Sequence, residues 1–231
     1  SIMKRIIYFV LAILVCGIYA GCSESEIELY NQTSRINFYG SLHIRTLVDT
    51  DYVKKDDPYA IDSFTVKIQG DLLKENRDFC VKVSPNSDYQ KSVDVLLESK
   101  YTYTELDTVC QAFYYKIKRP AVEAGRKVYG CFLEFDLNNP LHQFDKGLVE
   151  QHQIPLNVRW ELKTDEWGCW SGYKYGSYSD EKYMFIMDVC GCVYEELEEE
   201  DYDKVKQAYK EYREAGNPPI LGEDGDEIVY E

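Results

Sequence analysis

The chain has 231 residues, with 41 acidic and 26 basic side chains and a formal net charge of −15. This excess of acid excludes a surface for nucleic acid, whose phosphates require basic contacts, and disfavours docking on anionic lipid headgroups. Tyrosine is abundant, at 21 residues, and favours strands and amphipathic surfaces.

The N-terminal stretch predicts export from the cytoplasm. Lys4 and Arg5 precede an apolar run over 6–14 that is shorter than the roughly 20 residues of a membrane span. It fits the hydrophobic region of a secretory signal. Tyr19-Ala20-Gly21-Cys22 resembles the lipobox of bacterial lipoproteins, although leucine is usual where Tyr19 stands. We therefore expect a signal peptide over 1–21; an ordinary secretory signal with an incidental cysteine is the alternative.

Lipidation at Cys22 would make the mature chain a domain tethered to a membrane. Each buried CH₂ of a lipid chain contributes about 0.8 kcal/mol, and two or more chains hold a protein stably. Residues 22–33 predict a flexible tether, because the acidic stretch 23–28 cannot bury apolar area. In Bacteroidetes-type lipoproteins such a stretch resembles the signal for display on the outer face of the outer membrane. The expected location is therefore the extracellular face.

Residues 34–163 predict a β-sandwich domain. Apolar and polar residues alternate with period two in seven stretches, which is typical of half-buried strands; the stretches are 31–39, 64–68, 79–83, 93–97, 113–117, 129–135 and 156–162. Turn residues separate the stretches, and 47–59 is polar and rich in turn formers. Seven short strands without helical patterns between them indicate two antiparallel sheets packed face to face.

Residues 164–231 predict a smaller C-terminal region that contains helices. Ser179 could cap a helix through 183–190, although a strand over Tyr183–Val189 is an alternative. A second helix is expected where Tyr202, Val205, Tyr209 and Tyr212 recur at helical spacing, with Gly216 and Pro218-Pro219 ending it. The acidic tail from Gly222 is expected to be loosely held.

Three stretches carry a resemblance to a known family. The first is the lipobox. The second is Phe64–Gly70, followed by Leu73 and Arg77–Val83. The third, which carries most of the resemblance, is Tyr175–Phe185. The chain resembles Bacteroidetes lipoproteins of the domain of unknown function 4843 family. The resemblance implies an immunoglobulin-like or Calx-beta-like sandwich followed by a small C-terminal region. It also implies a setting similar to that of accessory lipoproteins of SusC/SusD-type nutrient uptake systems, and it offers no catalytic residues.

Aromatic side chains supply the best candidate binding site. They are Trp167, Trp170, Tyr173, Tyr175 and Tyr178, crowded in one short segment, with Trp160 expected in the sandwich core. Exposed rings stack on sugars, and nearby Asp or Lys can bond hydroxyls, so we expect a glycan or peptide ligand. The alternative is that these rings only pack the C-terminal segment.

Cysteines and acidic residues point to no metal or catalytic site. Six cysteines follow the lipobox, at irregular spacing: Cys80, Cys110, Cys131, Cys169, Cys190 and Cys192. We expect at most one or two disulfides, or mostly buried free thiols. The carboxylates of 223–227 lack the spacing of a calcium loop and are interpreted as a solvated tail. No catalytic triad motif is present, and we expect no cofactor and no enzymatic activity.

The sequence therefore favours a non-enzymatic outer-membrane lipoprotein that binds a nutrient glycan or peptide, or a SusC/SusD-type transporter. A structural or assembly lipoprotein without a small ligand is the alternative. A third and less favoured interpretation is a hydrolase with an unrecognised carboxylate site.

Overall fold

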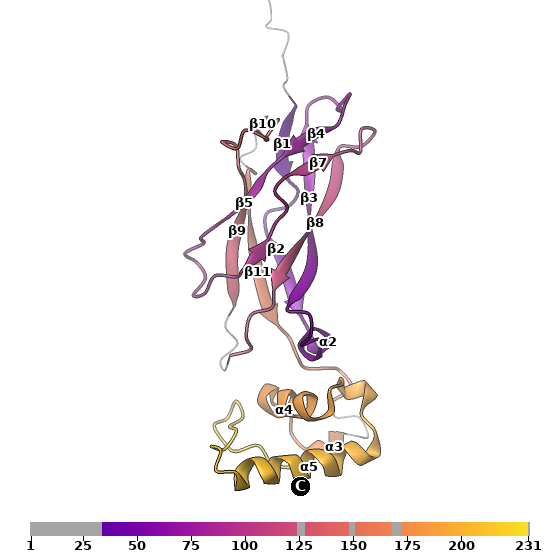
Figure 1. Ribbon diagram of the computed structural model, residues 1–231, viewed down its shortest axis with the longest axis vertical. Helices are drawn as coiled ribbons and strands as arrows, with labels where there is room; N and C mark the ends of the chain where they lie inside the picture. The colour runs from indigo at the N-terminus through magenta and orange to yellow at the C-terminus, as the bar shows by residue number, and fades with distance from the viewer. Residues whose placement is uncertain (1–33, 124–127, 148–150, 168–171, 231) are drawn as a thin grey trace, which may run out of the picture. The chain divides into compact units, whose positions relative to one another are not determined.

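Two β-sheets packed face to face form most of what the structure describes between residues 34 and 160 (Figure 1). The computed structural model describes residues 34–123, 128–147, 151–167 and 172–230; the proposed signal peptide, Cys22 and the tether lie outside them. The strands are β1 (Arg35–Phe38), β2 (His43–Leu47), β3 (Tyr59–Gln69), β4 (Arg77–Phe79), β5 (Val81–Ser84), β6 (Val95–Leu96), β7 (Tyr101–Tyr103), β8 (Cys110–Lys118), β9 (Tyr129–Phe135), β10 (Asp145–Lys146) and β11 (Gln153–Trp160).

The strand order confirms the predicted mainly β sandwich. One sheet runs β10-β1-β3-β8-β6, the facing sheet runs β2-β11-β9-β5, and β4 pairs with β7 in a small third sheet. Most pairs are antiparallel, as expected. The exceptions lie at sheet edges, where β10 runs parallel to β1 and β2 runs parallel to β11. The fully antiparallel prediction was therefore wrong at those edges.

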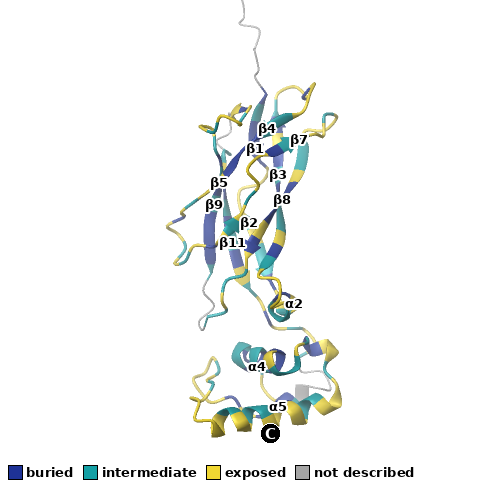
Figure 2. Cartoon of the chain, viewed as in Figure 1, coloured by how far each residue is buried: buried dark blue, intermediate teal, exposed yellow. Residues whose placement is uncertain are grey.

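Aromatic rings fill the space between the sheets. Phe38 stacks on Phe135 with ring centroids 4.2 Å apart, joining β1 of one sheet to β9 of the other. Phe64 and Phe79 contact further rings from β7 and β8. These residues occupy the inward positions of the alternating pattern, which Figure 2 shows as buried segments along the long strands. The prediction that these rings face the core is therefore correct.

The predicted strands differ from the observed ones where chain geometry interrupts the pattern. The stretch 79–83 is not one strand: it breaks at Cys80, so that β4 pairs with β7 whereas β5 pairs with β9. The stretch 93–97 contributes only the two-residue β6. Strands β2, β7 and β10 were not predicted, because strands of two to five residues show too little alternation to stand out.

A short helix, α2 (Asp49–Val53), lies inside the stretch expected to be irregular. Asp51 accepts the backbone N–H of Val48 at 3.1 Å, which satisfies one of the unpaired donors at the helix start. Asp49 and Asp51 both lie in the first turn, where the helix dipole favours negative charge. Acidic residues that looked like turn formers therefore start a helix here.

The C-terminal region is helical and has its own core. Its elements are α3 (Gly172–Tyr175), α4 (Asp180–Cys190), a 3₁₀ turn η1 (Tyr194–Glu196) and α5 (Glu199–Glu214). The Ser179 hydroxyl accepts the N–H of Lys182, as a helix cap does. Both predicted helices are confirmed, and the alternative strand over 183–189 is wrong. Tyr183, Ile186, Met187 and Val205 pack together in a second core.

Hydrogen bonds join the two regions. Tyr183 on α4 donates its hydroxyl proton to Asp49 of α2 at 2.7 Å and accepts the N–H of Tyr194 at 2.8 Å. Asp188 of α4 accepts hydrogen bonds from Tyr52 and Lys55. These hydrogen bonds between the sandwich and the helices thus come from α2 and from Lys55, which follows it. Among the described residues, no helix is long and apolar enough to cross a membrane.

A polar pairing ties the sheets together between β2 and β3. His43 Nε2 lies 2.8 Å from Asp62 Oδ2, and the Tyr115 hydroxyl donates to the same oxygen at 2.8 Å. Burial acts to raise the pKa of the Asp62 carboxyl, but the bonds and charge of His43, with those of Tyr115 and the Ser63 N–H, outweigh it and hold that pKa below its ordinary 3.8. Folding thus favours the charged carboxylate.

We expect Asp62→Asn to lower the free energy of unfolding by about 1–3 kcal/mol at neutral pH, because buried donors lose a charged acceptor. A lowered pKa stabilises the fold above the pKa of the unfolded chain, and this contribution disappears as pH falls through the folded pKa. The difference between wild type and variant should therefore shrink on acidification. Urea unfolding from neutral to about pH 3 measures it.

Asp203→Asn, at an exposed position on α5, is the matched control and should follow the acid dependence of the wild type. A difference between wild type and Asp62→Asn that stays constant over the whole pH range would contradict the account.

Candidate functional site

A pocket of about 230 Å³ opens at the end of the sandwich where α2 lies. We call it the α2 pocket. Its walls come from α2, from the loop that leads into β3, from the segment after β8 and from the end of β11. The lining residues are Asp51, Tyr52, Lys54, Lys55, Asp57, Pro58, Arg119, Pro120, Ala121, Val122 and Trp160.

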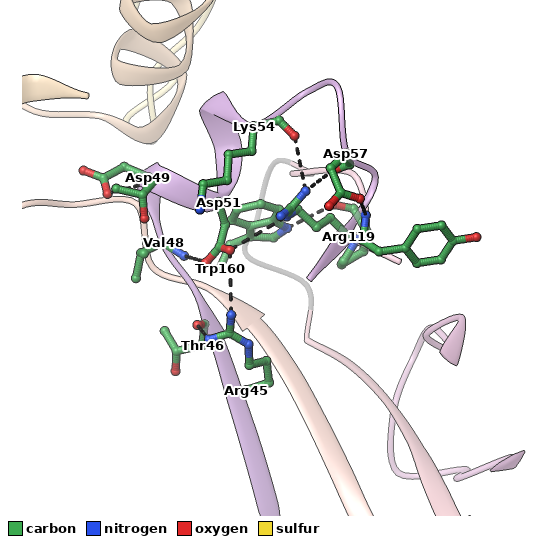
Figure 3. A network of polar contacts seen from close by, with 12 residues as sticks. Arg45, Thr46, Val48, Asp49, Asp51, Lys54, Asp57, Arg119 and Trp160 are labelled. Atoms are coloured by element: carbon green, nitrogen blue, oxygen red, sulfur yellow. Dashed lines mark hydrogen bonds and ion pairs between the residues drawn. The ribbon is translucent and has the colours of Figure 1, made fainter. Parts of the chain in front are cut away.

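Arg119 holds the loop wall of the pocket in place (Figure 3). Its Nη1 donates to the backbone carbonyls of Lys54, at 3.2 Å, and of Asp57. The side chain is 11% exposed, and its Nε lies 3.8 Å from Asp51 Oδ1. A guanidinium carries donors in a rigid fork, so one side chain can fix two points of the loop.

Asp51 is shared between two arginines (Figure 3). Its Oδ1 lies 3.7 Å from Arg45 Nη2 and 3.8 Å from Arg119 Nε, while its Oδ2 accepts the Val48 N–H. The carboxylate is 12% exposed and has both oxygens occupied. We conclude that Asp51 builds the floor of the pocket and is not offered to a ligand.

Two aromatic side chains wall the pocket. The indole N–H of Trp160 donates to the Pro120 carbonyl at 3.0 Å, which fixes the ring plane. Tyr52 lies edge-on to Trp160, with centroids 6.2 Å apart, and donates its hydroxyl proton to Asp188 at 3.1 Å. Burial, with the charge of Asp188, raises the pKa of Tyr52, so the phenol stays protonated. Both rings are half-buried.

Charged groups at the mouth of the pocket remain available. Lys54 and Asp57 are exposed, and neither side chain forms an ion pair with any residue that the structure describes. Asp57 accepts the Tyr59 N–H with one oxygen, which leaves the other open. Lys55 is instead paired with Asp188 and lies 5.2 Å over the Tyr52 ring. An ammonium and a carboxylate beside aromatic walls suit a neutral ligand rich in hydroxyls.

The aromatic residues predicted as a binding platform differ in how deeply the structure buries them. Tyr175 is 2% exposed and belongs to the second core, so its ring has no face for a ligand. Trp167 contacts the rings of Tyr178, Tyr183 and Tyr194 at 4.8–5.6 Å. Trp170 lies outside the described residues, and the structure does not describe the Tyr173 side chain. Packing therefore accounts for Tyr175 and largely for Trp167.

Tyr178 lines a second, polar groove together with the acidic tail. This groove of about 480 Å³ lies between the segment 174–182 and the tail residues 222–229. Lys163 lies 5.6 Å over the Tyr178 ring, and the phenol donates to Asp180 at 2.5 Å. Lys174 is paired with Glu199, and the Lys182 ammonium is bound by the Tyr175 carbonyl. The expected ligand role of Tyr178 stays a prediction.

Trp160 and the residues around it were the part of the site that sequence reasoning missed. We expected Trp160 in the core, but it is half-buried and packs against both cores. Tyr52, Lys54 and Arg119 were not singled out. The pair Tyr52-Val53 could have indicated a buried position here, because it is apolar and stands inside a charged stretch. Arg119, before Pro120, shows no pattern of its own.

The cysteines form no disulfide among the described residues. Cys80, Cys110, Cys131, Cys190 and Cys192 are free, and Cys169 lies outside that part of the chain. Burial raises the pKa of the Cys131 and Cys190 thiols to about 12, so neither acts as a thiolate at neutral pH. Within the same part, no group of three or more His, Cys, Asp or Glu residues could hold a metal ion.

Comparison with known proteins shows low similarity to solved structures. No family model matches the chain, and no curated protein matches its sequence. The Calx CBD1 domain in its apo form has a TM-score of 0.36 at 8% identity and covers 56% of this chain and 99% of its own length. A CBD12 structure from Calx 1.2 has a TM-score of 0.35 at 9% identity, covering 55% of this chain and 44% of its own.

A "putative carbohydrate binding protein" from Bacteroides ovatus has a TM-score of 0.38 at 10% identity and covers 56% of this chain and 38% of its own. This chain therefore spans less than half of the second and third structures. The sandwich assignment rests on the two sheets themselves. Membership of the domain of unknown function 4843 family stays a prediction.

Proposed function

We propose that the protein is a non-enzymatic, surface-tethered lipoprotein that binds an extracellular glycan in the α2 pocket. The observation that carries this proposal is the pocket itself, which combines two aromatic walls with an open ammonium and an open carboxylate. Aromatic faces contact the C–H groups of sugars, and charged groups form strong hydrogen bonds with their hydroxyls.

The size of the pocket bears on the ligand. Its volume of about 230 Å³ lies below the roughly 300–1,000 Å³ of pockets that enclose drug-sized molecules. A single sugar unit at the end or side of a longer chain suits such a space. Because Lys54 and Asp57 stand at the mouth, the rest of the glycan would continue into solvent.

The location completes the proposal. A lipid anchor at Cys22 would hold the domain at the outer membrane, on the extracellular face, where it meets glycans before a SusC/SusD-type transporter takes them up. The support is the signal-like stretch 1–21 with its lipobox, and the resemblance to the domain of unknown function 4843 lipoproteins. A peptide ligand is the alternative occupant of the same pocket.

We expect the mature protein to bind members of an array of oligosaccharides and polysaccharides, and Tyr52→Ala to weaken that binding by about tenfold, or ~1.4 kcal/mol. The ring wall is lost in this variant. Tyr52→Phe keeps the ring and should keep most of the affinity. Calorimetric titration of the best glycan from the array measures both.

Tyr114→Ala is the matched control, since Tyr114 is 67% exposed on β8 and does not line the pocket. Circular dichroism of each variant shows whether it is folded. An unchanged affinity in folded Tyr52→Ala, or binding of peptides and of no glycan, would contradict the proposal.

A further inference from the structure

The five-stranded sheet has an outer face that carries exposed tyrosines and hydroxyl groups. Alternate residues of β3 and β8 point away from the core, and the register sets them in rows across the two strands. Tyr114, 67% exposed, lies opposite Ser63, and Thr65 lies opposite Ala112. Tyr39, 62% exposed, follows β1, and its N–H donates to the Thr65 carbonyl at 2.8 Å. Two tyrosine rings thus flank a strip of hydroxyl groups and a small side chain.

Three lysines lie on the same face and have no acidic partner. Lys67 points outward on β3, and Lys116 and Lys118 point outward on β8. All three are exposed, and none forms an ion pair with a residue that the structure describes. No outward position of β3 or β8 holds an acid; Asp94 and Glu98 flank β6 at the edge of the sheet. The outer face of β3 and β8 is therefore locally positive.

The excess of acid in the chain lies mainly outside the sandwich. Residues 34–163 carry 18 basic and 19 acidic side chains, a net charge of −1. Residues 195–231 carry 4 basic and 14 acidic side chains, a net charge of −10. The net charge of −15 is thus no barrier at the outer face itself, where the local charges decide which ligand can approach.

The spacing of the lysines shows how the charge is distributed. Residues two apart on a strand lie about 7 Å apart, which is the spacing expected for Lys116 and Lys118. Lys67 pairs with Cys110, so about 20 Å of strand separates it from the row of Lys116. The positive charges are therefore sparse and lie at both ends of a neutral strip. Nucleic acid, with one phosphate per about 1.7 Å of duplex, carries far more charge than this strip could pair.

The side chains of the outer face suit a carbohydrate better than a protein. Protein–protein interfaces are depleted in lysine, serine and alanine, and these residues build much of the face. The bulky aliphatic side chains of Ile61 and Leu96 lie on either side of Lys116, so they form no continuous apolar centre. By contrast, tyrosine rings contact the C–H groups of sugars, and ammonium groups form strong hydrogen bonds with carboxylates and sulfates.

We propose that the outer face of β3 and β8 binds an acidic polysaccharide, one that carries uronate carboxylates or sulfate groups. An extended sugar chain lies along the strands, with its rings against the two tyrosines and its acidic groups at the lysines of both ends. The site is separate from the α2 pocket, which none of these side chains lines. The ligand also differs, since that pocket suits a neutral sugar. Tyr114→Ala therefore remains a control for a neutral glycan bound in the α2 pocket.

The test is calorimetric titration of the mature chain, carrying Cys22→Ser, with oligogalacturonate and with chondroitin sulfate oligosaccharides, which distinguish carboxylate from sulfate. We expect at least one of them to bind, and methyl-esterified oligogalacturonate, which lacks the charge, to bind at least about tenfold more weakly. Lys116→Glu should weaken binding of the acidic glycan by at least about tenfold. Lys204→Glu, at an exposed position on α5, changes the net charge equally and should leave the affinity unchanged.

Crossed variants separate this site from the α2 pocket. Tyr114→Ala should also weaken binding of the acidic glycan, whereas Tyr52→Ala should leave it unchanged. Circular dichroism shows whether each variant is folded. Failure of both acidic glycans to bind, equal affinities in Lys116→Glu and Lys204→Glu, or tighter binding of a polyglutamate peptide than of either glycan would overturn the proposal. None of these results would contradict binding of a neutral glycan in the α2 pocket.

Discussion

Replacing Phe79 by alanine is expected to lower the free energy of unfolding by about 3–5 kcal/mol, the range for large aromatic truncations in a core. Phe79 is fully buried, and its ring contacts those of Tyr101 at 5.5 Å and Phe113 at 4.8 Å. It also meets Phe64, Phe135 and Phe144. The cavity left behind touches both sheets, so neither can close it alone. Urea denaturation followed by circular dichroism measures the loss.

Tyr114→Ala removes a ring of similar size from an exposed position on β8 and should change stability by less than about 0.5 kcal/mol. A loss for Phe79→Ala no larger than that of this control would show that the aromatic cluster is not the core of the sandwich.

Asp51→Ala is expected to cost about 3 kcal/mol, because it leaves the largely buried Arg45 and Arg119 without their shared carboxylate. The Nε atoms of both arginines are already buried without a hydrogen-bond partner among the described residues. The substitution also removes the acceptor for the Val48 N–H at the start of α2. Thermal and urea unfolding of the variant measure the effect.

Asp51→Asn separates the two contributions, since the amide can still accept from Val48 but carries no charge. Relative to Asp51→Ala, it should recover only the stability contributed by the bond at the start of α2, about 1 kcal/mol. As a control, Lys210→Ala breaks the exposed pair with Glu214 and should cost less than about 0.5 kcal/mol. Equal effects of Asp51→Ala and Lys210→Ala would contradict the role given to the network.

Period-two alternation predicted the sandwich because inward positions carry large side chains. Phe64, Val66 and Ile68 on β3 were expected on one face and are all buried. The helices were predicted because their signals are local: Ser179 caps α4, and Gly216 adopts a positive φ of 83° after α5. Such features depend on neighbours in the sequence and need no knowledge of the fold.

The remaining features depend on contacts between distant residues. Strand β2 exists because β11 offers it a ladder, more than a hundred residues later in the chain. Tyr175 is buried because α5 and η1 cover it, through the rings of Tyr202 and Tyr194, and nothing in its own segment distinguishes burial from exposure. The α2 pocket depends on Arg119 reaching back to the Lys54 carbonyl. No local pattern records such a contact.

The most direct test of the proposed function is nuclear magnetic resonance of the Trp160 indole N–H. Its signal is assigned by its loss in Trp160→Phe, and the bond to the Pro120 carbonyl places it in the pocket wall. If the α2 pocket holds the sugar, titration with the best-binding glycan shifts this signal and those of Lys54 and Tyr52 with one common affinity. Shifts confined to the groove of Tyr178, with the Trp160 signal unmoved, would contradict the assignment of the site.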